Sequence, residues 1–174
     1  SCAATGATRD LTYPLRRQRQ MFRRDGGDMF GTKGADHLAQ PGMISRIIGG
    51  SYPSGPSSAE PPVIRQMVKR NEVAAYNVPS GIIFDMLREG AAKRPGVMTK
   101  VGLDTFVDPT QEGCAMNEAA QAEPVVSRID FMGEEWLYFP AIRPTVAIIR
   151  ATTGDERGNL PFEDEGAYLG AMEL

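Results

Sequence analysis

The chain has 174 residues, of which 41% are hydrophobic and 24% are charged, a composition typical of a globular protein rather than a disordered one. This length suits a single domain with a buried core. The formal net charge of −3 lacks the positive surplus of most nucleic-acid binders, which argues against that class of partner.

Histidine and cysteine, the usual ligands of zinc, are rare in the chain. His37 is the single histidine, and Cys2 and Cys114 are the two cysteines, so a multi-histidine metal site is excluded and no zinc or disulfide framework is indicated. A lone histidine is more often a structural hydrogen-bonding residue than a catalytic one. No apolar run approaches the roughly 20 residues that cross a bilayer, and the first residues do not follow the secretory pattern. We therefore expect a cytoplasmic protein with no membrane partner.

The first 33 residues are expected to form an atypical segment that is poorly ordered or altered in sequence. An arginine cluster here shows no amphipathic period, and such a cluster in a net acidic chain is usually a solvated face. Its members are Arg16, Arg17, Arg19, Arg23 and Arg24. From residue 34 onward the pattern becomes regular.

A short strand is predicted at 44–48, followed by a loop at 51–58 that is rich in serine, proline and glycine. Ser57 and Glu60 have the spacing of a capping box, which favours a helix over 62–70. We expect that helix to direct three apolar side chains inward, namely Val63, Met67 and Val68.

A strand at 73–78, a helix at 82–92 and a strand at 97–101 continue the alternation. Strands and helices that alternate at this spacing predict a parallel sheet with crossover helices. The predicted fold class is therefore α/β, with an open, mostly parallel sheet and helices on both faces.

The later part of the chain has a different character. Aromatic residues on either side of Gly133 predict a β-hairpin insertion over 128–139. Beyond it we expect a buried strand at 145–150, a polar loop at 152–159, and a helix that starts near Asp164 and is cut short at Leu174.

Glycine-bearing loops at the predicted strand ends are the candidate binding elements. They are Gly49–Gly50, Pro79–Gly81, Gly102–Thr105 and Glu112–Gly113. In an open parallel sheet, ligands bind beyond the carboxyl ends of the strands, where glycine lets backbone amides approach an anionic group. Spacing alone leaves open, and indeed favours, the alternative that these glycines simply make turns. No P-loop, dinucleotide-binding glycine motif or nucleophile elbow occurs.

Several of these segments together resemble family I coenzyme A transferases that act on short acyl groups and 3-keto acids. The segments are 101–109 with 111–113, 76–81, 134–138, 149–159, 34–39 and 47–50. They occur in order from residue 34 to residue 174, and together they are more specific than any one alone. The similarity is to the N-terminal, or alpha, half, which is expected here to be truncated at its C-terminus.

This resemblance implies an α/β/α fold and a ping-pong reaction in which a glutamate attacks the acyl-CoA and later carries CoA as a thioester. Coenzyme A would enter as the thioester substrate, with no separate cofactor, and a short carboxylic acid would be the second substrate. The family places that glutamate in the second half, so we expect the nucleophile outside this chain. The implied partners are a catalytic beta half or subunit and further copies of the chain.

For the substrate loops, the resemblance implies contacts from Ser80, Gly81, Gly102, Thr105, Glu112 and Gly113. Backbone amides of these loops would stabilise tetrahedral oxyanions. Three positions depart from the family pattern: Ser80 replaces a common glutamine, whereas Asp104 and Cys114 replace common glycines. Within the chain, Glu112 is the best internal candidate for a nucleophile, although a role in lining the site is the better interpretation.

Two other classes of function stay open at this point. A truncated, non-catalytic homologue would act only as an oligomerising or interaction module and would show no transferase activity under any complementation. A sugar-phosphate isomerase or a transcriptional sensor shares the general architecture, but the sequence has no phosphate loop to support it.

Overall fold

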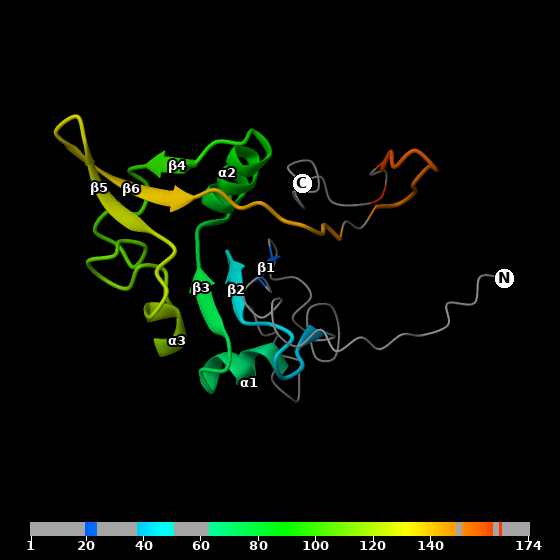
Figure 1. Ribbon diagram of the computed structural model, residues 1–174, viewed down its shortest axis with the longest axis horizontal. Helices are drawn as coiled ribbons and strands as arrows, with labels where there is room; N and C mark the ends of the chain where they lie inside the picture. The colour runs from blue at the N-terminus through cyan, green and yellow to red at the C-terminus, as the bar shows by residue number, and fades with distance from the viewer. Residues whose placement is uncertain (1–19, 24–37, 51–62, 149–150, 162–163, 165–174) are drawn as a thin grey trace.

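The computed structural model describes residues 20–23, 38–50, 63–148, 151–161 and 164. In this part of the chain the fold is mixed α/β, with one parallel and one antiparallel three-stranded sheet (Figure 1). The parallel sheet has the order β1-β2-β3, formed by β1 (Gln20–Arg23), β2 (Arg46–Gly49) and β3 (Ala74–Asn77). The predicted strands at 44–48 and 73–78 are thus confirmed. β1 was not predicted, because it lies in the arginine-rich segment.

Helices pack on opposite faces of the parallel sheet. Helix α1 (Val63–Lys69) shares a core cluster with Ile47 of β2 and Ala75 of β3. Helix α2 (Ser80–Ala91) shares the other cluster with Ile48 and Tyr76, the next residues along each strand. Because successive side chains of a strand point to opposite faces, this alternation places one helix on each side. Both faces of the sheet are therefore buried.

The second sheet is antiparallel and has the order β4-β6-β5. It comprises β4 (Gly96–Thr99), β5 (Ser127–Phe131) and β6 (Glu134–Pro140). β5 and β6 form the predicted hairpin, whose two-residue turn consists of Met132 and Gly133 with φ values of 56° and 80°. Two successive positive φ values are the signature of a type I′ turn, which matches the twist of the strands.

The prediction that the strand at 97–101 joins the parallel sheet is wrong. β4 pairs antiparallel with β6 instead. The edge of β3 where a further strand would add is already occupied by an isolated antiparallel bridge between Tyr76 and Ala115. Gly96 also suits its actual partner, since a Cβ there would lie 2.2 Å from the carbonyl oxygen of Phe139.

The buried strand expected at 145–150 is not found in the residues that the structure describes, 145–148. Val146 and Ile148 are 77% and 85% exposed, in an extended segment that leaves the second sheet at Pro140. An apolar run becomes a buried strand only if another surface covers it, and no strand in the described part of the chain pairs with this one. The polar loop at 152–159 is confirmed.

Helix boundaries differ in smaller ways. α2 begins at Ser80, so Ser80 and Gly81 lie in its first turn rather than in a loop before it. In α1, Met67 and Val68 are buried as predicted, but Ile64 takes the inward position expected for Val63. The serine-rich loop at 51–58, the capping box and nearly all of the last predicted helix fall outside the described residues. Among those described, no helix is long and apolar enough to cross a membrane.

Candidate functional site

A turn-rich loop, residues 100–117, connects the two sheets and reaches the carboxyl end of β3. Its last residues run antiparallel to β3. The amide of Asn77 donates to the carbonyl of Cys114 at 2.8 Å, and the amide of Met116 donates to the carbonyl of Ala75 at 2.9 Å. Backbone hydrogen bonds therefore fix the end of the loop against the central part of the fold.

Asp108 organises the middle of this loop from a fully buried position. Its carboxylate accepts from the amides of Asp104 and Thr110 at 3.0 and 2.9 Å, from the Thr110 hydroxyl at 2.9 Å, and from Arg128 at 2.9 Å. Burial alone would raise the pKa of Asp108, but these donors and the charge of Arg128 outweigh it and lower the pKa. The residue is therefore held as a carboxylate.

Arg128 carries this contact across to the hairpin. It is part of β5, and besides Asp108 it pairs with Glu135 on the neighbouring strand β6 and with Asp104, 3.6 Å away. The guanidinium thus bridges the loop and the second sheet. Glu134 and Glu135 are exposed, and each is also in an ion pair.

Asn117 fixes the opposite end of the loop. Its side-chain oxygen accepts from the amides of Ala75 and Ala120, at 3.3 and 3.1 Å. Its side-chain nitrogen donates to the carbonyls of Val68 and Val73, both at 2.8 Å. The contact with Ala120 caps the N-terminus of the short helix α3 (Glu118–Gln121). One amide group thus joins β3, the end of α1 and α3.

The loop uses left-handed backbone conformations at several positions. Gly102 has a φ of 98°, and a Cβ there would lie 2.7 Å from the side chain of Val107. Gly113 and Cys114 follow one another at 58° and 66°, and Asp104 is at 59°. Glycine adopts this region readily, whereas other residues do so at a cost. The two positions where the related family commonly has glycine, Asp104 and Cys114, are thus both left-handed.

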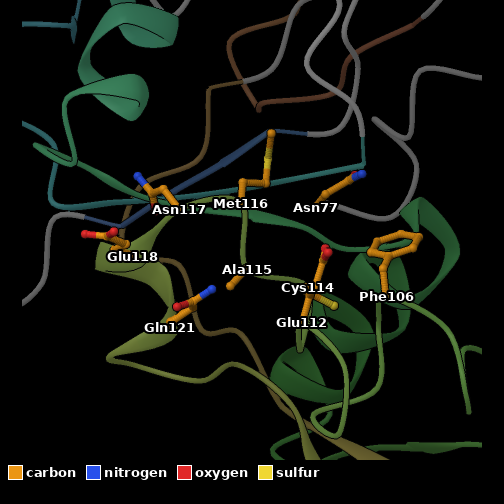
Figure 2. A pocket seen from close by; sticks show the side chains of 9 residues that line it. All are labelled: Asn77, Phe106, Glu112, Cys114, Ala115, Met116, Asn117, Glu118 and Gln121. Atoms are coloured by element: carbon orange, nitrogen blue, oxygen red, sulfur yellow. The ribbon is translucent and has the colours of Figure 1, made fainter.

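An open pocket of about 520 Å³ lies beside this loop at the carboxyl end of β3 (Figure 2). Nine residues line it, drawn from the end of β3, the second part of the loop and α3. They are Asn77, Phe106, Glu112, Cys114, Ala115, Met116, Asn117, Glu118 and Gln121. The carboxyl end of a parallel strand is where ligands bind in folds of this kind, so this pocket is the candidate site.

Of the predicted substrate residues, Glu112 lines the pocket, and the buried Gly113 follows it in the chain. The others do not line it. Gly102 and Thr105 form a turn in which the Thr105 hydroxyl donates to the carbonyl of Gly102 at 2.7 Å.

Ser80 and Gly81 are exposed in the first turn of α2. Ser80 packs closely against Gly50, because a Cβ at Gly50 would lie 2.0 Å from the Ser80 hydroxyl oxygen. The carboxyl ends of β2 and β3 meet at this contact.

The electrostatics of the pocket restrict what it can hold unaided. Glu112 and Glu118 supply carboxylates, and none of the nine lining residues is lysine or arginine. The amides of Gly113, Cys114 and Ala115 donate to carbonyls within the loop, so in this arrangement they are not free to stabilise an oxyanion. Helix α2, in contrast, begins without a side-chain cap, and the N-terminus of a helix favours negative charge.

Among the described residues, Cys114 and Glu156 are poorly placed for covalent chemistry, whereas Glu112 lines the pocket. Burial raises the pKa of the Cys114 thiol to about 12, which suppresses the reactive thiolate. Glu156 is exposed in the polar loop and does not line the pocket. Among the described residues, no three acidic, histidine or cysteine side chains gather to hold a metal ion.

Sequence patterns had not singled out Asp108, Arg128 or Asn117. The signals available were local ones: an aspartate two residues before a threonine is typical of a side-chain turn, and an asparagine before Glu118 is typical of a helix cap. Neither signal reveals the partner, since Arg128 lies twenty residues beyond Asp108 and Val68 lies 49 residues before Asn117.

Comparison with known protein families identifies the class to which this α/β domain belongs. The family model for coenzyme A transferase matches residues 21–173. The chain therefore belongs to the coenzyme A transferase family. This match begins at residue 21, whereas the segments that resemble the family by sequence pattern begin at residue 34.

Individual relatives are more specific. The chain is 38% identical over 142 residues to acetate CoA-transferase YdiF of Escherichia coli K12, covering 82% of this chain and 25% of that protein. It is 47% identical over 103 residues to caffeate CoA-transferase of Acetobacterium woodii, covering 59% of this chain and 20% of that protein. It is 26% identical over 130 residues to acetate CoA-transferase subunit alpha of E. coli K12, covering 75% of this chain and 50% of that subunit.

A solved structure shows the same relationship. Acyl-CoA transferase YdiF from E. coli O157:H7, in a thioester complex with CoA, superposes with a TM-score of 0.73 at 34% identity. The superposition covers 91% of this chain and 31% of that one. The chain thus spans about a quarter of the length of the first curated relative that it matches.

Proposed function

We propose that the chain is the alpha-type part of an acyl-CoA:carboxylate CoA-transferase for short-chain or 3-keto acids. In this proposal it contributes substrate loops, and the glutamate nucleophile lies in a second half. The observation that carries the proposal is the position of the loop 100–117. Hydrogen bonds of Asp108 and Asn117 hold this loop beside an open pocket at the carboxyl end of β3. Membership of the family supports the reaction class.

The proposed reaction is a covalent exchange that passes through the glutamate. The glutamate carboxylate attacks the thioester carbonyl, the C–S bond breaks, and an acyl-glutamyl anhydride and CoA thiolate form. The thiolate then attacks the glutamyl carbonyl and expels the first acid, which leaves a glutamyl-CoA thioester. A second acid reverses the sequence and leaves as its own CoA thioester, so one difficult exchange is divided into easier steps.

Within this scheme, the chain's own residues provide position rather than a nucleophile. Ser80 and Gly81, in the uncapped first turn of α2, are the proposed contacts for an anionic oxygen. Glu112 lines the acyl pocket, and Gly102 and Thr105 set the turn that supports it. Because the pocket itself offers no cation, we assign binding of the CoA phosphates to the second half.

The test is a chimera in which this chain replaces the corresponding quarter of YdiF, the relative with 38% identity. Acyl exchange is measured from acetyl-CoA to propionate, acetoacetate and caffeate, with the chain alone and YdiF lacking that quarter as controls. The proposal predicts exchange by the chimera and none by either control. A chimera that folds with the circular dichroism of YdiF but exchanges no acid would contradict it.

A second candidate, a non-catalytic interaction module, is favoured by the exposed apolar residues Val146 and Ile148. It predicts self-association of the chain that V146S and I148S abolish, together with an inactive chimera. Sedimentation of the chain at increasing concentration, with and without these substitutions, separates it from the transferase.

A further inference from the structure

Two sets of polar contacts, which we call clamps, hold the loop 100–117: Asn117 contacts the parallel sheet and Asp108 contacts the antiparallel one. Part of the pocket wall lies between them in the chain. Asn117 fixes the end of the loop to β3, while Asp108 fixes its middle to the hairpin through Arg128. Glu112 and Cys114 lie between these two fixed points and form part of the pocket (Figure 2). Their position therefore depends on both clamps.

We infer that Arg128 is a positioning residue for the substrate pocket, and that it acts through Asp108 on the segment Glu112–Cys114. This inference rests on the proposed function and names a residue that does not itself line the pocket. Among the described residues, the ion-pair partners of Arg128 are Asp104, Asp108 and Glu135, none of which lines the pocket. Its effect on the pocket is consequently indirect.

The path from Arg128 to the pocket consists of hydrogen bonds within the loop. The carboxylate of Asp108 receives the guanidinium, and the backbone carbonyl of Asp108 accepts the amides of Gln111 and Gly113, at 2.9 and 3.0 Å. The amide of Cys114 donates in turn to the carbonyl of Phe106 at 3.0 Å. Displacing Asp108 would thus move the backbone of Gly113 directly and that of Cys114 through it.

The geometry of Asp108 explains why its cationic partner matters. The side chain is fully buried, and a buried carboxylate that loses a charged donor becomes costly to keep in place. Three other donors to the Asp108 carboxylate remain after loss of Arg128. We therefore expect a loosened loop rather than an unfolded protein.

The test compares R128Q with R128K and with R88Q, a matched control that removes an arginine paired with Asp85 on the surface of α2. Amide hydrogen exchange is measured on the chain itself. R128Q is expected to speed exchange of residues 101–117 by about 10- to 100-fold while α2 is unchanged. R128K, which keeps one charged donor, should lie between R128Q and the wild type, and R88Q should match the wild type.

Turnover in the YdiF chimera gives the second readout. R128Q is expected to lower kcat/KM by about 10- to 100-fold, since a small misplacement of a substrate-positioning element has an effect of that size. R128K should restore part of it, whereas R88Q should have no effect. Unchanged loop exchange, or an equal increase in the loop and in α2, would overturn the inference.

The two proposals fail in different ways. If the wild-type chimera is inactive but R128Q selectively loosens the loop, the proposed function is wrong and the positioning of the loop stands. If the wild-type chimera is active and R128Q leaves both kcat/KM and loop exchange unchanged, the positioning role of Arg128 is wrong and the proposed function stands.

Discussion

The side-chain nitrogen of Asn117 lies 2.8 Å from the carbonyl oxygen of Val73, a contact between residues 44 positions apart. With its three other hydrogen bonds, this contact satisfies backbone groups at the start of β3, in the last turn of α1 and in the first turn of α3. A buried backbone group without a partner is costly, so this single amide stabilises the junction of three elements.

Replacing Asn117 by alanine removes all four hydrogen bonds. We expect the free energy of unfolding to fall by about 2–4 kcal/mol, because a helix cap and several internal partners are lost together. Urea denaturation measures the change. N159A is the matched control: the Asn159 side chain donates to Asp155 in an exposed turn, and its loss should cost less than about 1 kcal/mol. Equal effects of the two substitutions would contradict this account.

Glycine adopts the left-handed backbone conformation of Asp104 more readily than aspartate does, so we expect D104G to be tolerated. Asp104 has a φ of 59° and an 83% exposed side chain, so glycine removes strain and little packing. We expect D104G to change stability between neutral and about 1 kcal/mol of stabilisation. D130G makes the same change within strand β5 and should destabilise by about 1 kcal/mol. Thermal denaturation of both variants tests this expectation. If D104G is less stable than D130G, the backbone at Asp104 is not strained.

The buried thiol of Cys114 is expected to resist alkylation in the folded protein. With a pKa of about 12, about one thiol in ten thousand is a thiolate at pH 8, and the side chain is fully buried as well. In a C2S background, iodoacetamide should label Cys114 only in urea, which mass spectrometry detects. Labelling of the folded protein at the unfolded rate would be inconsistent with the packing described.

The lowered pKa of Asp108 predicts that the folded protein loses stability in acid. Its pKa is lowered in the folded state, so the unfolded chain takes up the proton first as the pH falls. The stability that its carboxylate provides is therefore present at neutral pH and is lost as the pH falls through the lowered pKa of the folded state.

Urea denaturation of D108N across pH 7 to pH 3 checks this. The wild type should be more stable than D108N at pH 7, and the difference should shrink as the pH falls. D85N, which alters an exposed carboxylate on α2, is the control for the removal of one negative charge. A difference between wild type and D108N that stays constant to pH 3 would argue against the assignment.

Local patterns predicted the elements that the chain builds from neighbouring residues. The helix α2 followed from Ile83, Met86 and Leu87, which share one face and are all buried. The hairpin followed from its aromatic residues and the turn at Gly133. In each case the decisive spacing lies within a few residues, so the sequence alone carries the signal.

Partners distant in sequence were not predictable in the same way. Alternation showed that the strand at 97–101 is part of a sheet but not which sheet, because the edge of β3 is taken by Ala115, well beyond it in the chain. The apolar residues Val146 and Ile148 indicated burial, yet the pattern contains no information about what would cover them. The clamps at Asp108 and Asn117 escaped notice for the same reason.

The bridge between Tyr76 and Ala115 has a consequence for the behaviour of the protein in solution. A bare β3 would present a row of unpaired amides and carbonyls, a template on which another chain could add a strand and start aggregation. The antiparallel segment that ends the loop uses those groups internally, through Asn77, Cys114 and Met116. The same few residues that border the pocket thus also protect the sheet from association with misfolded copies.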